Sequence, residues 1–138
     1  MRLDLLINDF VHKAVVNRSL IVYEHHFMRT FIHVHDMARA FCFALDNADE
    51  MLGEVYNVGS DSMNHSKQEV CELIRERVPG FYLHYAEIGQ DADKRNYIVA
   101  YDKIVRLGYE TAVTVPEGID ELVRGLEAVP FREEYRNT

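Results

Sequence analysis

The stretch from Met28 to Leu45 joins a strand pattern directly to an amphipathic helix pattern. The run Thr30 to Val34 has the aromatic and β-branched character of a strand. After it, apolar residues recur with helical period at Met37, Ala40, Phe41, Ala44 and Leu45. Asp36 stands at the junction, where a short carboxylate is a favoured helix N-cap. The sequence therefore predicts a strand followed directly by a helix, with Arg29 just before the strand.

The rest of the chain alternates the same two patterns and predicts an α/β fold of short strands and amphipathic helices. Helical spacing predicts a helix over residues 2–16, and capping-box pairs predict two later helix starts, at Ser66 with Glu69 and at Thr114 with Glu117. Further strands are expected over residues 20–23, 54–58 and 81–86. A polar loop over residues 87–94 has no evident core role and could carry function. We expect one domain, residues 1–138, in which 129–138 form a charged tail.

Composition narrows the class of protein. Of the residues, 15 are basic and 23 acidic, a formal net charge of -8, which argues against a nucleic-acid-binding surface. No apolar run has the length that spans a bilayer, so no membrane association is expected. Cys42 and Cys71 fall at apolar helical positions, which predicts two buried, reduced thiols and a cytoplasmic protein.

Four motifs then point to a family. They are Arg29-Thr-Phe-Ile-His-Val-His-Asp36 before a helix, Gly53-Glu-Val-Tyr-Asn-Val-Gly59, the Asp93-Lys-Arg95 segment with Leu107-Gly-Tyr109 after it, and Thr114-Val-Pro-Glu-Gly-Ile119. In this order they resemble the C-terminal, substrate-binding half of extended short-chain dehydrogenase/reductases, the NAD-dependent nucleotide-sugar epimerases and dehydratases. The resemblance implies part of a Rossmann-type enzyme, an oxidoreductase, isomerase or lyase that uses NAD or NADP when complete.

Two features of that family are missing from the sequence. We find no glycine-rich turn that would admit a dinucleotide pyrophosphate, and no Tyr-x-x-x-Lys pair that would move a proton. We therefore expect a fragment without the cofactor-binding sheet, with no catalytic, cofactor-binding or metal residues of its own. The alternative is a non-catalytic sugar-nucleotide-binding or assembly subunit that completes a site on another chain. In either case, the unpaired strand over 54–58 predicts a homo-oligomer or a Rossmann-type partner segment.

The resemblance also assigns substrate-binding roles to four residues. It implies that Arg95 and Arg29 grip the diphosphate of a nucleotide sugar, a task that suits the planar guanidinium fork. Asn8 would present an amide to the same ligand, and Tyr97 would pack on its base or ribose. The structural alternatives are a surface Arg95 paired with Asp91 or Asp93, an Arg29 paired with Glu24, a solvated Asn8 and a half-buried core Tyr97.

The histidines raise one further alternative. His33 and His35 would lie on one face of a strand, where two imidazoles can begin a zinc site, although no third ligand is specified. His33 is part of the Ile-His-Val motif of the family, which explains its presence without a metal. Asn57, on the Tyr-Asn-Val-Gly strand, is expected to hold neighbouring backbone rather than ligand.

Overall fold

The structure, a computed structural model, describes residues 2–91 and 93–129. Its elements in chain order are α1 (Leu6–His12), the π-helical turn η1 (Lys13–Asn17), β1 (Ser19–Tyr23), β2 (Met28–Thr30), α2 (Val34–Asp46), α3 (Ala48–Met51), the 3-10 turn η2 (Asp61–Met63), β3 (Asn64–Ser66), α4 (Lys67–Arg77), β4 (Tyr82–Ala86), α5 (Asp102–Val105) and α6 (Val115–Ala128). Within these residues no helix is both long and apolar enough to cross a bilayer.

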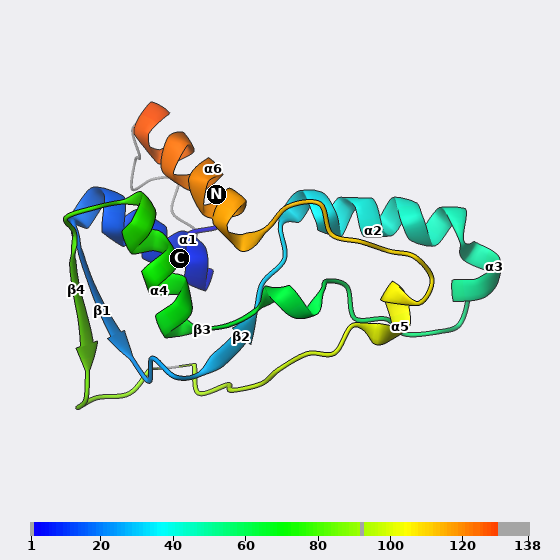
Figure 1. Cartoon of the computed structure of the whole chain (residues 1–138), viewed down its shortest axis with the longest axis horizontal. Coiled ribbons are helices and arrows are strands. Elements are labelled where there is room, and N and C mark those ends of the chain that lie inside the picture. Colours follow the sequence, from blue (N-terminus) through cyan, green and yellow to red (C-terminus); the bar gives the residue numbers. More distant parts are fainter. Residues whose placement is uncertain (1, 92, 130–138) are drawn as a thin grey trace.

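Two small sheets organise the chain (Figure 1). β1 pairs in parallel with β4, with Ser19 opposite Tyr82 at one end and Tyr23 opposite Ala86 at the other. β2 pairs antiparallel with β3, and Arg29 lies opposite His65. Because a parallel pair needs a crossover, α4 returns the chain to β1. The predicted strands 20–23 and 81–86 are confirmed.

The larger core lies between the β1–β4 sheet and helices α1, α4 and α6, which Figure 1 shows on its left side. Its fully buried side chains include Val11, Leu20, Val70, Ile74 and Ile119. All but Leu20, which lies on β1, come from the apolar stripes of the predicted helices, so burial of those stripes stabilises this part of the fold. Both capping boxes are confirmed, at Ser66 with Glu69 and at Thr114 with Glu117.

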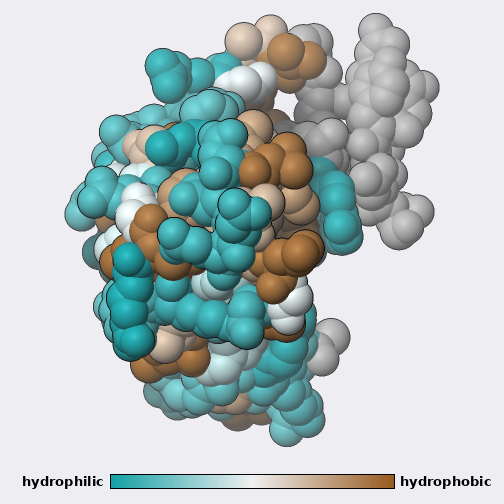
Figure 2. All heavy atoms as spheres, turned by 90° about the vertical axis from the view of Figure 1, so that its right-hand side faces the viewer, coloured by the Kyte–Doolittle hydropathy of each residue, from teal (hydrophilic) through white to brown (hydrophobic). Residues whose placement is uncertain are grey.

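A second, smaller core lies under α2, on the right side of Figure 1. Ala40 of α2 packs there with Tyr101, Ile104 and Tyr109, all buried. The opposite face of α2 carries apolar side chains that nothing in the described residues covers, since Phe41 is 70% and Leu45 is 78% exposed. Figure 2, which faces this end of the molecule, shows apolar side chains reaching the surface between hydrophilic ones.

The predicted junction of strand and helix is wrong in detail. β2 ends at Thr30, and α2 begins at Val34 with His33, not Asp36, as its N-cap. Asp36 is instead fully buried in the first turn of α2, where its carboxylate accepts hydrogen bonds from the backbone amides of Ala112 and Val113 at 2.9 and 3.0 Å. An acceptor is needed there because these partly buried amides have no strand or helix partner.

Three other predictions also fail. The first helix begins at Leu6 rather than Arg2, because residues 2–5 form a turn that Asn8 closes by donating to the Arg2 carbonyl at 2.8 Å. Residues 54–58 form no strand and pair with no described strand, and Val55 is 85% exposed. Cys42 is exposed, because it lies on the uncovered side of α2, whereas Cys71 is buried as predicted, and both are free thiols. Of the predicted tail, residues 130–138 lie outside the described residues.

Candidate functional site

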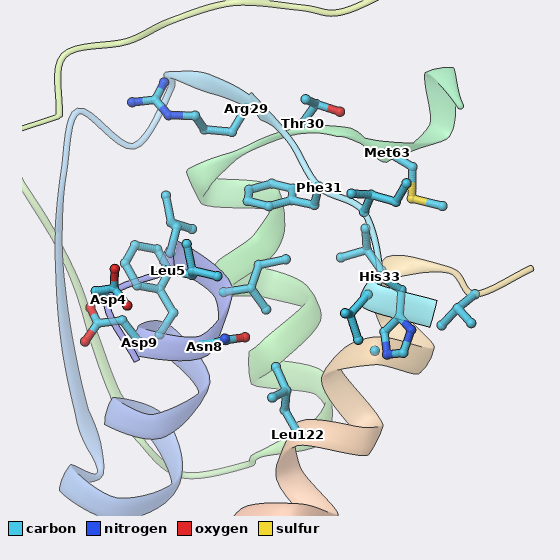
Figure 3. Close-up of a pocket in the computed structure, with 18 of the residues that line it drawn as sticks. Asp4, Leu5, Asn8, Asp9, Arg29, Thr30, Phe31, His33, Met63 and Leu122 are labelled. Carbon is cyan, nitrogen blue, oxygen red and sulfur yellow. The ribbon is translucent and has the colours of Figure 1, made fainter. Parts of the chain in front are cut away.

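A cavity of about 730 Å³ opens between α1, the segment from Arg29 to Val34 and the start of α6 (Figure 3). The lining includes the polar and charged residues Asp4, Asn8, Asp9, Arg29, Asp91, Asp93 and Arg95. It also includes the apolar residues Leu5, Phe31, Met63, Val115 and Leu122. A cavity of this size with a few convergent polar groups is a typical small-molecule site. Three of the four predicted site residues, Arg29, Arg95 and Asn8, line it.

Arg29 enters the cavity wall from the middle of β2 and is only 4% exposed. Its Nη2 donates to the backbone carbonyl of Asp93 at 3.0 Å and lies 3.3 Å from that residue's carboxylate, while Nη1 donates to the carbonyl of Met28 at 2.9 Å. The expected structural alternative, a pair with Glu24, is therefore wrong in its partner, because the loop after β4 brings Asp93 to Arg29.

Arg95 projects from the same loop and its side chain is 71% exposed. Its Nε and Nη2 donate to the two carboxylate oxygens of Asp93 at 2.7 and 2.6 Å, the bidentate geometry that guanidinium groups favour. These hydrogen bonds, more than the weaker opposing effect of burial, hold the pKa of Asp93 well below its usual range. Asp93 thus holds Arg95, an accessible cation, beside Arg29.

Asn8 and Tyr97 differ in their relation to the cavity. In Figure 3, Asn8 lies on α1 across the hollow from Arg29. Tyr97 is not among the lining residues; its ring centroid lies 5.7 Å from the guanidinium carbon of Arg29, and its backbone amide donates to Met28 at 3.3 Å. Tyr97 is thus brought to Arg29 rather than to the cavity. Asn57 donates to the carbonyl of Ala100 at 3.1 Å, as expected, although it lies on an exposed segment.

The geometry does not favour the zinc alternative. His33 and His35 do not share a strand face, because the chain turns into α2 there and the Nδ1 of His33 accepts from the His35 amide at 3.2 Å. The Nε2 of His33 lies 3.3 Å from Glu121 of α6, on the cavity wall. Within residues 2–91 and 93–129, no group of three His, Cys, Asp or Glu side chains could hold a metal ion.

Every acidic residue that lines the cavity has a basic partner. Each of its five acidic lining residues contacts a basic side chain: Asp4 with Arg2, Asp9 with Lys13, Asp91 with Lys67, Asp93 with both arginines, and Glu121 with His33. The pair of Arg95 with Asp93 is the structural alternative stated from the sequence, whereas the contact of Asp93 with Arg29 was not predicted. Sequence reasoning also missed Lys67, for which the sequence offered no signal.

The starts of the long helices are poor sites for a dinucleotide pyrophosphate. A dinucleotide pyrophosphate binds where the first backbone amides of a helix are free. The long helices of the described chain each begin with a side chain that accepts from one of those amides: His33 at α2, Ser66 at α4 and Thr114 at α6. An acidic residue also stands in the first turn of each, which disfavours an incoming phosphate.

Comparison with known proteins shows which family this chain resembles. The model of the NAD dependent epimerase/dehydratase family matches residues 2–59. The fold is similar to dTDP-glucose 4,6-dehydratase from Bacillus anthracis, solved with NAD, at 25% identity and a TM-score of 0.76, over 99% of this chain and 42% of that one. It is also similar to UDP-glucose 4-epimerases from Thermus thermophilus, solved with NAD, and Thermotoga maritima, solved with UDP-glucose. Both are 21% identical, with TM-scores of 0.70 and 0.73, over 88% and 90% of this chain and 40% of each of theirs.

The chain therefore has an α/β fold that matches part of a Rossmann-type enzyme. The resemblance to the NAD-dependent epimerase/dehydratase family, predicted from four short motifs, is confirmed. The chain spans about two fifths of the length of the proteins it matches.

Proposed function

We propose that this chain is the substrate-binding portion of an NAD(P)-dependent nucleotide-sugar epimerase or dehydratase, and that its cavity holds the diphosphate of the sugar nucleotide. The observation that carries the proposal is the convergence of Arg29 and Arg95, 66 positions apart in the sequence, on one carboxylate at the edge of one cavity. Two adjacent guanidinium groups offer a diphosphate several charged hydrogen bonds. The apolar residues of the lining would pack against the less polar part of the ligand.

The ion pairs of Asp93 with both arginines affect how such a ligand would bind. Because Asp93 already occupies both guanidinium groups, a diphosphate must share or displace that carboxylate. Arg95 is the better placed to turn toward the ligand, since most of its side chain is in solvent, whereas Arg29 is fixed by the carbonyls of Met28 and Asp93. We therefore assign Arg95 the direct contact and Arg29 a fixed positive charge behind it.

Calorimetry with UDP-glucose and dTDP-glucose tests the proposal. Loss of a charged hydrogen bond costs about 1.5 to 3 kcal/mol, so Arg95→Ala is expected to weaken binding roughly ten- to a hundred-fold. Arg95→Lys keeps the charge but loses the planar guanidinium, so its affinity should lie between those of the wild type and Arg95→Ala. Arg75→Ala is the matched control, because Arg75 is also an exposed arginine paired with a nearby carboxylate, on α4 away from the cavity. Equal affinity in the wild type, Arg95→Ala and Arg29→Ala would remove these arginines from the site.

The proposal assigns cofactor and catalysis to residues outside this chain. In the complete enzyme NAD or NADP would take hydride from the sugar, and the keto intermediate would then be epimerised, dehydrated or reduced. The capped helix starts support the expectation that this chain alone binds NAD no better than weakly and has no epimerase or dehydrogenase activity. Micromolar NAD binding in a calorimetric titration would contradict it. The two free thiols support a cytoplasmic location.

The alternative function is a non-catalytic subunit that completes a site on another chain. The exposed face of α2 and the unpaired segment 54–58 favour a partner for this surface in either case. If the chain is such a subunit, mixing it with a separate Rossmann-type chain from the same source should produce epimerase or dehydratase activity. Failure of every such chain to bind would favour a truncated enzyme.

A further inference from the structure

Lys67 breaks two rules of protein folding at once. It is the first residue of α4, where the helix dipole disfavours a cation, and its side chain is fully buried, where an ammonium group is costly unless paired. Residues that break such rules are expected at functional sites more than elsewhere. The function proposed above does not use Lys67.

The ammonium group of Lys67 is directed to the loop that carries Arg95. Its Nζ donates to the carboxylate of Asp91 at 2.6 Å and to the carbonyl of Tyr23 at 3.2 Å, and it lies 5.5 Å from the ring centroid of Phe27. Burial of Asp91 opposes ionisation, but hydrogen bonds from Lys67 and from the Asp93 amide outweigh it, so the pKa of Asp91 lies below its usual value. The Asp91 carboxylate is therefore ionised at neutral pH.

From Asp91 the contacts continue to the cavity. Its second carboxylate oxygen accepts from the backbone amide of Asp93 at 3.0 Å. The carboxylate of Asp93 in turn accepts from the amide and the guanidinium of Arg95. A connected series of hydrogen bonds thus runs from the buried lysine to the exposed arginine.

The start of α4 does not need this ammonium group. Ser66 and Glu69 form its capping box, and the Lys67 backbone amide donates to the carbonyl of Phe27 at 3.1 Å. An apolar side chain of similar length could fill the same space without the cost of burying a charge. The contacts of the ammonium explain its presence better than the stability of the helix does.

We propose that Lys67 is a positioning residue, which holds Asp91 and, through it, Asp93, so that Arg95 stands at the cavity edge for the diphosphate of a nucleotide sugar. The identity of the ligand rests on the function proposed above. The role of Lys67 in holding Asp91 and Asp93 rests on the hydrogen bonds alone. Lys67 thus affects ligand binding by positioning Arg95, and it does not contact the ligand itself.

Two measurements test it on the full chain. In Lys67→Met, amide exchange followed by NMR should become at least about ten-fold faster at Asp93 and Arg95 and stay unchanged in α6. Lys103→Met, which removes an exposed lysine paired with Glu54, should leave both regions unchanged. Asp91→Asn is the second variant, should Lys67→Met fail to fold, and should have the same local effect. Unchanged exchange at Asp93 and Arg95 in the variants that fold would overturn the positioning role.

A double-mutant cycle with UDP-glucose then separates positioning from general damage. Lys67→Met should weaken binding about ten-fold when Arg95 is present and hardly at all in Arg95→Ala, and Lys67→Arg should restore part of the loss. An equal loss in both backgrounds would show that Lys67 does not act through Arg95. If the wild type binds no UDP-glucose, the proposed function fails, while the exchange measurement still decides whether Lys67 holds the loop.

Discussion

Asp36 offers the sharpest test of how this fold is held together. Its carboxylate is fully buried and accepts three hydrogen bonds, from the amides of Ala112 and Val113 and from Arg39 at 2.8 Å. Its backbone carbonyl also accepts from the hydroxyl of Tyr109 at 2.6 Å. It therefore connects α2 to the segment that leads into α6.

Asp36→Asn retains one acceptor oxygen and replaces the other with an NH2 group that faces an N–H donor. One charged hydrogen bond is lost and one partly buried amide loses its acceptor, so we expect a fall of about 2 to 4 kcal/mol in the free energy of unfolding. Urea denaturation at pH 7 measures it. Asp46→Asn, at the exposed end of the same helix, is the control and should stay within about 0.5 kcal/mol of the wild type.

The same variant predicts a pH dependence. Burial opposes ionisation of Asp36, but its hydrogen bonds outweigh that effect and lower its pKa below the usual value. A lowered pKa in the folded state means that the stabilisation is complete above the unfolded pKa of about 4 and is lost as the pH falls through the folded pKa. The difference between wild type and Asp36→Asn should therefore narrow below pH 4. A loss under about 0.5 kcal/mol at pH 7, or a constant difference down to the acid transition, would refute this account.

Three other predictions follow from single side chains. Burial raises the pKa of the Cys71 thiol to about 12, so a thiol reagent at pH 8 should label only Cys42 in the native protein, and Cys42→Ser should abolish labelling. Ser66→Ala removes the N-cap of α4 and should lower the free energy of unfolding by about 1 kcal/mol in urea denaturation; no change would show that the capping box is dispensable. The uncovered face of α2 should drive association, so light scattering at micromolar concentration should show an oligomer that Phe41→Glu with Leu45→Glu shifts to monomer, and a monomeric wild type would contradict this.

The sequence by itself determined the features whose partners are close along the chain. Both capping boxes join residues three apart, and the apolar stripes of α4 and α6 repeat within single helices, so local pattern was sufficient. The motifs also selected Arg29 and Arg95, and the family resemblance selected Asn8; the fold brings all three to one cavity.

Tertiary structure alone decided the features that depend on distant partners. Asp36 resembles an N-cap in the sequence, yet it is buried, because its partners are 76 and 77 residues away. Arg29 pairs with Asp93 across 64 residues and not with the nearer Glu24. The segment 54–58 has the composition of a strand but has no described strand beside it. A strand exists only with a partner, and a buried charge is tolerated only with its counter-charge, so neither can be assigned before the chain has folded.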